Sequence, residues 1–176
     1  SDGVEAELRR LNGTVRLSTV ESAANAWVIP AVGLLRNLHP DIRVEILTSE
    51  HYVDLARGEA DVAVRFGPRP TQDVLIVRHI LDMLESLYAT EQLVERLGMP
   101  SNIEDLARYP IVASTDIESA TNRWLRKHGL AAGIVQRANS LSSIIASVRS
   151  GLGAAILPCI MGDDFPGLVR LLPPIE

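Results

Sequence analysis

Hydrophobic and polar residues alternate in short blocks along this chain, and the blocks switch between the periodicity of strands and that of helices. Residues 15–20 alternate as a strand does, and residues 29–38 carry apolar side chains at the spacing of one buried helix face. The runs 43–47 and 61–65 predict a second and a third strand, with a short helix over 52–58 between them. This order of elements is typical of parallel α/β sheets.

The second half of the chain continues the alternation of strand and helix. Predicted strands cover residues 74–77, 84–89, 111–113 and 154–157, and predicted helices cover 90–97, 122–128 and 141–148. Asn139 and Ser140 precede the last of these helices and are residue types that cap helices. A further short helix is predicted over residues 2–12.

Composition adds limits to this α/β pattern. The chain has 176 residues, of which 47% are hydrophobic and 22% charged, so it can bury a core as one domain or as two small lobes. A net charge of −5 and only 4% aromatic residues argue against a surface for nucleic acid. If the protein acts on DNA, the part that reads DNA is not in this chain.

The N-terminus and the single cysteine bear on the compartment. The first residues are polar and acidic and do not form a signal peptide, and no apolar run is long enough to span a membrane. One cysteine allows no internal disulfide. We therefore expect a bacterial cytoplasmic protein without a membrane partner, while a secreted protein that has lost its signal peptide remains the alternative.

Polar residues follow each of the first three predicted strands, at the edge where open parallel sheets bind ligands. The candidate ligand-binding residues in this half are Thr19, Glu21, Ser22, Thr48, Ser49, Arg65, Phe66 and Gly67. Arg65 is expected either to hold a carboxylate with its guanidinium fork or to pair with Asp61 or Glu59. Ser22 is either a ligand contact or a helix cap. Glu21 is suited to a ligand amine or to the helix dipole.

Other chemistry finds little support in the sequence. The glycines around Leu152 follow a helix and precede a strand, which is the reverse of a dinucleotide-binding loop. Cys159 has no basic neighbour in the sequence, so a buried structural thiol is favoured over a redox sensor. The four histidines show no metal-ligand spacing, and no catalytic set is evident. We expect no cofactor, no metal and no enzymatic activity.

Several sequence motifs occur together in an order that resembles the effector-binding domain of LysR-type transcriptional regulators. They are Gly13-Thr14-Val15-Arg16-Leu17, Val28-Ile29-Pro30, Leu38-His39-Pro40-Asp41-Ile42, Asp61-Val62-Ala63-Val64-Arg65-Phe66-Gly67 and Gly151-Leu152-Gly153-Ala154-Ala155-Ile156-Leu157-Pro158. The sequence of the fourth motif resembles that found in the branch of the family that includes regulators of glycine cleavage and of β-lactamase induction. The likeness extends from about residue 12 to the last residue.

The resemblance implies two Rossmann-like lobes, as in type II periplasmic binding proteins, with an effector in the cleft between them. It assigns residues 1–13 to the end of a linker helix, residues 14–81 and 155–176 to lobe I, and residues 82–154 to lobe II. The family usually continues through another strand and helix, so these parts of lobe I are expected to be missing. From lobe II, the resemblance suggests ligand contacts by Ser114, Thr115, Asn139 and Ser140, and a helix cap explains the last two equally well.

The resemblance also implies partners. It predicts a small-molecule effector, homodimers or homotetramers, and DNA binding through an N-terminal helix-turn-helix that this chain does not include. Arg65 favours a carboxylate, and Glu21 favours an amine, which an amino acid or a short peptide would combine. The helix around Leu34 and the strand 43–47 are candidate dimer surfaces. A solute-binding receptor of a transporter, or a small enzyme on the same fold, is the alternative.

Overall fold

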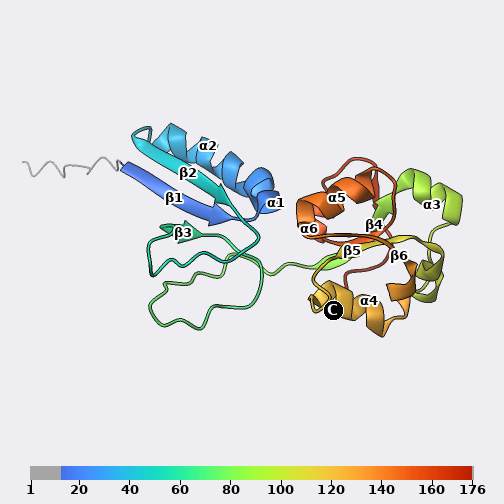
Figure 1. Ribbon diagram of the computed structural model, residues 1–176. Helices are drawn as coiled ribbons and strands as arrows, with labels where there is room; N and C mark the ends of the chain where they lie inside the picture. The colour runs from blue at the N-terminus through green and yellow to red at the C-terminus, as the bar shows by residue number, and fades with distance from the viewer. Residues whose placement is uncertain (1–12, 176) are drawn as a thin grey trace, which may run out of the picture. The chain divides into compact units, whose positions relative to one another are not determined.

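The computed structural model describes residues 13–175, which form parts of two compact units, Ser1–His79 and Ile80–Glu176 (Figure 1). The predicted helix over residues 2–12 lies outside the described residues. Each unit has its own sheet, so the strands of each are described separately.

Unit 1 is built on a three-stranded parallel sheet, as the sequence predicts. Its strands are β1 (Gly13–Thr19), β2 (Ile42–Thr48) and β3 (Val62–Ala63), in the order β2-β1-β3. The pairing of β1 with β2 is in register from one end to the other, so Thr19 lies opposite Thr48. All three strands are parallel, and their carboxyl ends therefore meet at one edge of the sheet.

A single helical run connects β1 to β2 and changes its pitch on the way. It begins as α1 (Glu21–Ala23), widens to the π-helical segment η1 (Ala24–Val28) and continues as α2 (Ile29–Leu38). The wide turn ends just before Pro30, whose ring would clash with a carbonyl of the preceding turn in a regular α-helix. Figure 1 shows this run alongside β1 and β2.

Two elements predicted for unit 1 are not formed. Residues 52–58 make turns instead of a helix: the Asp54 carboxylate accepts from Arg57 N (3.1 Å) as a helix cap would, but Gly58 takes a left-handed conformation with φ of 74° and ends the turn. Residues 74–77 are not a strand, and Ile76 is fully exposed. A strand requires a partner edge, which local sequence does not reveal.

Unit 2 contains a mixed set of strands. An antiparallel sheet has the order β7-β4-β8, formed by β7 (Ala155–Pro158), β4 (Glu85–Thr90) and β8 (Leu168–Arg170). A parallel pair is formed by β5 (Ile111–Ser114) and β6 (Ile134–Ala138). A parallel bridge between Ile111 and Ala154 connects β5 to the residue that precedes β7.

The strand pairing of unit 2 corrects the assignment of residues 155–176 to lobe I. Both β7 and β8 hydrogen-bond to β4, and Ile175 bridges to Glu85, so this segment is part of unit 2 as far as it is described. Antiparallel pairing depends on contacts between residues about 70 positions apart, which periodicity does not reveal.

The helices of unit 2 are α3 (Glu91–Leu97), the 3₁₀ helix η2 (Glu104–Arg108), α4 (Ala120–Lys127), the 3₁₀ helix η3 (Leu130–Gly133), α5 (Leu141–Arg149) and α6 (Cys159–Gly162). Three of them, α3, α4 and α5, follow the predicted helices over residues 90–97, 122–128 and 141–148 closely, while the short helices η3 and α6 were not predicted. Thr90, Ser119 and Ser140 accept hydrogen bonds at the starts of α3, α4 and α5. The core of the unit includes Leu87, Leu106 and Ile111, all fully buried, and Cys159 is a buried free thiol, as predicted.

Gly153 lies where the residues that lead into β7 pack closely against the start of β5, and substituting it tests this packing. A Cβ at this position would lie 2.5 Å from Pro110 O, a backbone atom that cannot move independently. We expect Gly153→Ala to lower the free energy of unfolding by about 1–3 kcal/mol in urea titrations. Gly33→Ala is the control, because nothing lies within 4 Å of its Cβ and alanine favours a helix interior. Equal losses of stability in the two variants would contradict this packing.

Candidate functional site

The carboxyl ends of the three strands of unit 1 lie next to one another, as the sequence predicts. Ser49 N, just after β2, donates to Thr19 O at the end of β1 (2.9 Å). Val64 N, just after β3, donates to Ser18 O (2.9 Å). These bonds bring the candidate residues Thr19, Thr48 and Ser49 together at one edge and place Arg65 beside them.

The Arg65 guanidinium joins the three strand ends. Its Nη2 donates to Ser18 Oγ (2.7 Å) and to His51 O (3.1 Å), and its Nη1 donates to Ser49 O. These acceptors are all neutral. Within the part of the chain that the structure describes, no carboxylate forms a salt bridge with Arg65.

The alternative pairing of Arg65 with Asp61 or Glu59 is wrong for this structure. The Asp61 carboxylate accepts from Arg16 N (2.7 Å), and the Glu59 carboxylate accepts from Asp54 N (2.7 Å). Asp61 thus satisfies a backbone donor of β1, and Glu59 satisfies one in the segment between β2 and β3.

The expected bidentate clamp on a carboxylate needs a correction as well. Both protons of Arg65 Nη2 are directed to protein acceptors, so the terminal fork is not free. The Nε–H is buried and has no hydrogen-bond partner among the described residues. The donors that remain are therefore this Nε–H and one proton of Nη1.

Two hydroxyl groups, one at the end of β1 and one in the helix that follows it, also lack a hydrogen-bond partner within the described residues. Thr19 is 0% exposed and Ser22 is 7% exposed, and neither Thr19 Oγ1 nor Ser22 Oγ has a hydrogen-bond partner within the described residues. A buried polar group without a partner costs about 1–3 kcal/mol. Ser22 is the second residue of α1 and makes no capping bond, so the capping alternative does not explain it. The two hydroxyls can donate to or accept from a ligand.

The other candidates of unit 1 differ in how exposed they are. Glu21, Thr48 and Gly67 are exposed, and Phe66 is half-buried. The Phe66 ring meets Trp27 edge to face, with 5.8 Å between ring centroids. Tyr52 Oη donates to Phe66 O (3.3 Å).

Sequence reasoning missed three residues that contact this site: Ser18, Trp27 and Tyr52. Ser18 stands next to the candidate Thr19, and Tyr52 follows the candidate Ser49 by three positions, so their nearness to the strand ends was an available signal. The role of Trp27 depends on a helix packing against the segment after β3, and the sequence carries no sign of that contact.

The four candidates of unit 2 form a separate group at the carboxyl ends of β5 and β6. Ser114 pairs with Ala138, and Thr115 N donates to Ala138 O (2.9 Å). Asn139 and Ser140 follow directly. Ser140 Oγ accepts from Ser143 N (3.2 Å), which confirms the predicted cap of α5.

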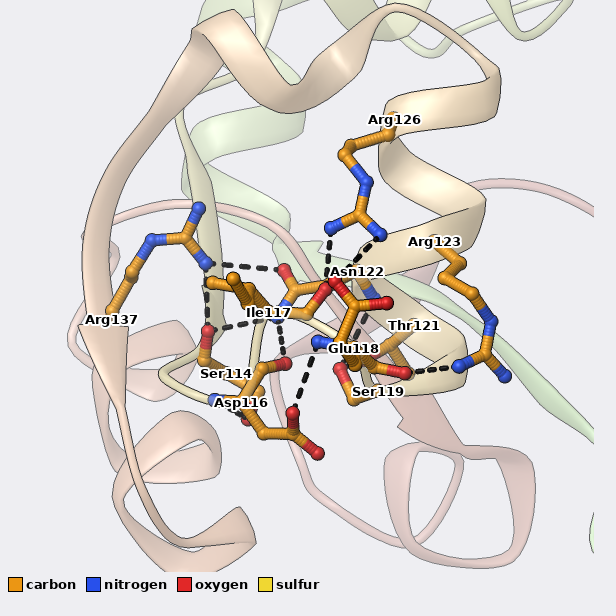
Figure 2. Close-up of polar contacts among 10 residues, drawn as sticks. All are labelled: Ser114, Asp116, Ile117, Glu118, Ser119, Thr121, Asn122, Arg123, Arg126 and Arg137. Carbon is orange, nitrogen blue, oxygen red and sulfur yellow. Dashed lines mark hydrogen bonds and ion pairs between the residues drawn. The ribbon is translucent and has the colours of Figure 1, made fainter.

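A buried amide holds the loop after β5 in place (Figure 2). The Asn122 side chain is 2% exposed and donates to Ser114 O (2.9 Å) and Asp116 O (2.6 Å). Arg137 Nη1 donates to the same Ser114 carbonyl (2.7 Å) and to Asn122 Oδ1 (3.2 Å). Ser114 Oγ accepts from Asp116 N (3.1 Å). The protein thus already uses the main polar atoms of Ser114.

Two arginines of α4 donate hydrogen bonds to backbone carbonyls of this loop, as Figure 2 shows. Arg123 donates to Glu118 O, and Arg126 donates to Ile117 O. Arg126 also forms an ion pair with the Glu118 carboxylate (3.6 Å), an exposed contact worth little by itself. The loop is therefore a rigid support for Thr115.

Perturbed ionisation occurs elsewhere in unit 2 and has a structural origin. Burial, with a hydrogen bond to Asp163 (2.7 Å), raises the pKa of the Tyr88 phenol. The same bond, together with Arg170, lowers the pKa of the Asp163 carboxyl. These contacts fasten β8 and the end of α6 to β4. Burial raises the pKa of the Glu85 carboxyl.

In the described ranges, no group of three or more histidine, cysteine or acidic residues is placed to hold a metal ion. The helices that the structure describes include none long and apolar enough to cross a membrane.

We expect Asn122→Leu to lower the free energy of unfolding by about 1–3 kcal/mol, because Asp116 O would be left without its buried donor. Urea denaturation measures the change. Asn139→Leu, at an exposed position, is the matched control and should change stability by less than about 0.5 kcal/mol. An unchanged midpoint for Asn122→Leu would show that the amide does not hold the loop.

Glu85 predicts a pH dependence of stability. Because its pKa is higher in the folded state, the unfolded state ionises first as the pH rises, and stability is lost from the ordinary glutamate pKa upward. We expect Glu85→Gln to raise the unfolding midpoint at pH 7, with the gain disappearing below about pH 4. Glu95→Gln, on the exposed side of α3, is the control. A gain that grows toward low pH would contradict the burial of the Glu85 carboxyl.

Comparison with solved structures confirms the predicted fold class. The chain is similar to the CrgA regulatory domain of Neisseria meningitidis, a LysR-type transcriptional regulator (TM-score 0.78, 22% identity, 92% of this chain and 82% of that one). It is also similar to the AmpR effector binding domain of Citrobacter freundii (TM-score 0.75, 19% identity, 94% and 84%). These domains have a type II periplasmic-binding-protein-like fold.

Sequence comparison agrees with the structural likeness. The chain is 26% identical over 155 residues to the HTH-type transcriptional regulator PgrR of Escherichia coli (strain K12), covering 85% of this chain and 52% of PgrR. It is 24% identical over 151 residues to the HTH-type transcriptional activator AmpR of Citrobacter koseri, covering 82% and 50%. The chain thus spans about half the length of these curated relatives. The family described as the LysR substrate binding domain matches residues 8–176. The chain belongs to this family, as its sequence motifs predicted.

Proposed function

We propose that this domain is the effector-binding part of a LysR-type transcriptional regulator and that it binds a small anionic effector at the strand-end site of unit 1. The observation that carries this proposal is the half-buried Arg65 guanidinium, which has only neutral acceptors within the described residues. Three buried polar atoms at the end of β1, in α1 and after β3, namely Thr19 Oγ1, Ser22 Oγ and Arg65 Nε, have no hydrogen-bond partner within the described residues.

The charge of Arg65 favours an anion over a neutral ligand. Removing a cation from water is costly unless a counter-charge or a full set of hydrogen bonds replaces the water. A carboxylate would accept from Arg65 Nε–H, and the two hydroxyls would donate to its oxygens. Glu21 is exposed in the first turn of α1 and could pair with an ammonium group. A carboxylate, an amino acid or a short peptide would meet these requirements.

The surrounding protein is proposed from the family. The relatives named above are transcriptional regulators, which favours this role over that of a transport receptor or an enzyme. We infer that DNA is bound through a helix-turn-helix outside this chain and that the domain forms homodimers or homotetramers. Leu34 on α2 is 68% exposed, and β2 is an edge strand, so these surfaces are suited to a dimer contact.

Thr19→Val tests the site because it removes a hydroxyl while it keeps the shape of the side chain. We expect the free protein to be as stable as the parent or more so, because the lost hydroxyl has no partner in the described structure. Binding should weaken by about 0.5–1.5 kcal/mol, as for the loss of one neutral hydrogen bond. Calorimetry with the tightest binder from a panel of small carboxylates and amino acids measures this change.

The control for this variant is Thr14→Val at the exposed start of the same strand, which should bind like the parent. Equal affinity of the parent and of Thr19→Val would remove Thr19 from the site. A panel without any binder would contradict the proposed function as a whole.

A further inference from the structure

The three aromatic residues of unit 1 are linked by contacts to one another, and one of them lies over Arg65. They are Trp27, Tyr52 and Phe66, in a chain with only seven aromatic residues in total. The Arg65 guanidinium carbon lies 5.8 Å from the centre of the Tyr52 ring, within the range of a cation–π contact. Tyr52 contacts Phe66 through its hydroxyl, and Phe66 contacts Trp27 through its ring. The Tyr52 link runs to the main-chain carbonyl of Phe66, so two kinds of contact connect the three aromatic residues: this hydrogen bond and the ring pair of Phe66 with Trp27.

These rings do not form the core of unit 1. The buried apolar residues of the unit are small, namely Ala23, Ala24, Val28 and Ala60. Tyr52 is 70% exposed, while Trp27 and Phe66 are half-buried. Large aromatic side chains usually contribute most to a protein core, and clustered exposed ones commonly mark a binding surface. Placement beside a polar site therefore points to a ligand rather than to packing.

The segment after β3 is shaped to hold one of these rings. Gly67 has φ of 127°, and a Cβ there would lie 3.2 Å from Tyr52 Oη. A glycine at this position lets the backbone pass close to the tyrosine hydroxyl, which bonds to Phe66 O. The direction of the Tyr52 ring over Arg65 is thus set by the backbone as well as by the cation.

We propose that the effector is an aromatic carboxylate, whose anionic group meets Arg65, Thr19 and Ser22 while its ring packs against Trp27 and Phe66. Ligand sites typically combine an apolar lining with a few polar groups that fix orientation, and this edge of unit 1 offers both. The inference rests on the proposed function, because it names the chemical class that the same site accepts.

Matched probes separate the ring from the charge. Benzoate carries both, cyclohexanecarboxylate keeps the charge and the size without the aromatic face, and benzamide keeps the ring without the charge. Binding is measured with the 176-residue protein by calorimetry, and by the fluorescence of Trp27 in a Trp124→Phe background, which leaves one tryptophan. We expect benzoate to bind about three- to tenfold more tightly than cyclohexanecarboxylate and to change the Trp27 emission.

Variants locate this preference. Phe66→Leu should lose part of the preference for benzoate over cyclohexanecarboxylate, because only Trp27 remains to contact the ring, while it retains the preference for benzoate over benzamide. Arg65→Lys should make the affinities for benzoate and benzamide more similar, because the Nε–H that the carboxylate accepts from is lost. The Trp124→Phe background, changed in unit 2 only, should leave every affinity as in the parent.

Each outcome has a separate meaning. Equal affinity for benzoate and cyclohexanecarboxylate in the parent would overturn the aromatic class and leave the anion site standing. Equal affinity for benzoate and benzamide would overturn the anion site of the proposed function. No binding of any probe at millimolar concentration would overturn both.

Discussion

The arrangement of the candidate site depends on one side chain, the half-buried guanidinium of Arg65. It donates to the hydroxyl of Ser18 and to the carbonyls of Ser49 and His51, and so fastens the ends of β1 and β2 to the segment after β3. Without this cation the three ends would have no shared partner of comparable strength, since hydrogen bonds from charged donors are stronger than neutral ones. The same arrangement leaves the Nε–H unused and the charge without a carboxylate in the described residues.

Like the Arg65 Nε–H, the buried hydroxyls of Thr19 and Ser22 have no hydrogen-bond partner within the described residues. A protein selected for stability alone would replace such buried groups with apolar ones, because each costs free energy without a partner. Thr19 follows Ser18, which bonds to Arg65, and Ser22 lies in the helix after the same strand, so the cost is understandable if a ligand at this strand end completes the hydrogen bonds. Unit 2 presents the contrasting case, because its buried Asn122 has partners for both its amide nitrogen and its amide oxygen.

Much of this could be read from the sequence, for particular reasons. Thr19, Thr48 and Ser49 could be predicted as neighbours because they are hydroxylic residues at the ends of predicted strands, and parallel strands end at one edge of the sheet. The pairing of Ala155–Pro158 with β4, the neutral partners of Arg65 and the contact between Trp27 and Phe66 could not be predicted. Each depends on residues far apart in the chain, which local periodicity does not encode. The turn at Asp54 was missed because the Asp54 side chain bonds as a helix cap does, while the left-handed Gly58 ends the turn after Arg57.

The central claim is that Arg65 Nε–H is the donor reserved for the effector, and nitrogen NMR of the arginine side chains tests it directly. The Arg65 resonance is assigned by its loss in Arg65→Lys and followed while benzoate is added to the 176-residue protein. We expect the Arg65 Nε–H signal to shift with saturation at the calorimetric Kd, while that of Arg137, in unit 2, stays in place. Saturable binding that leaves the Arg65 signal unmoved would contradict the claim.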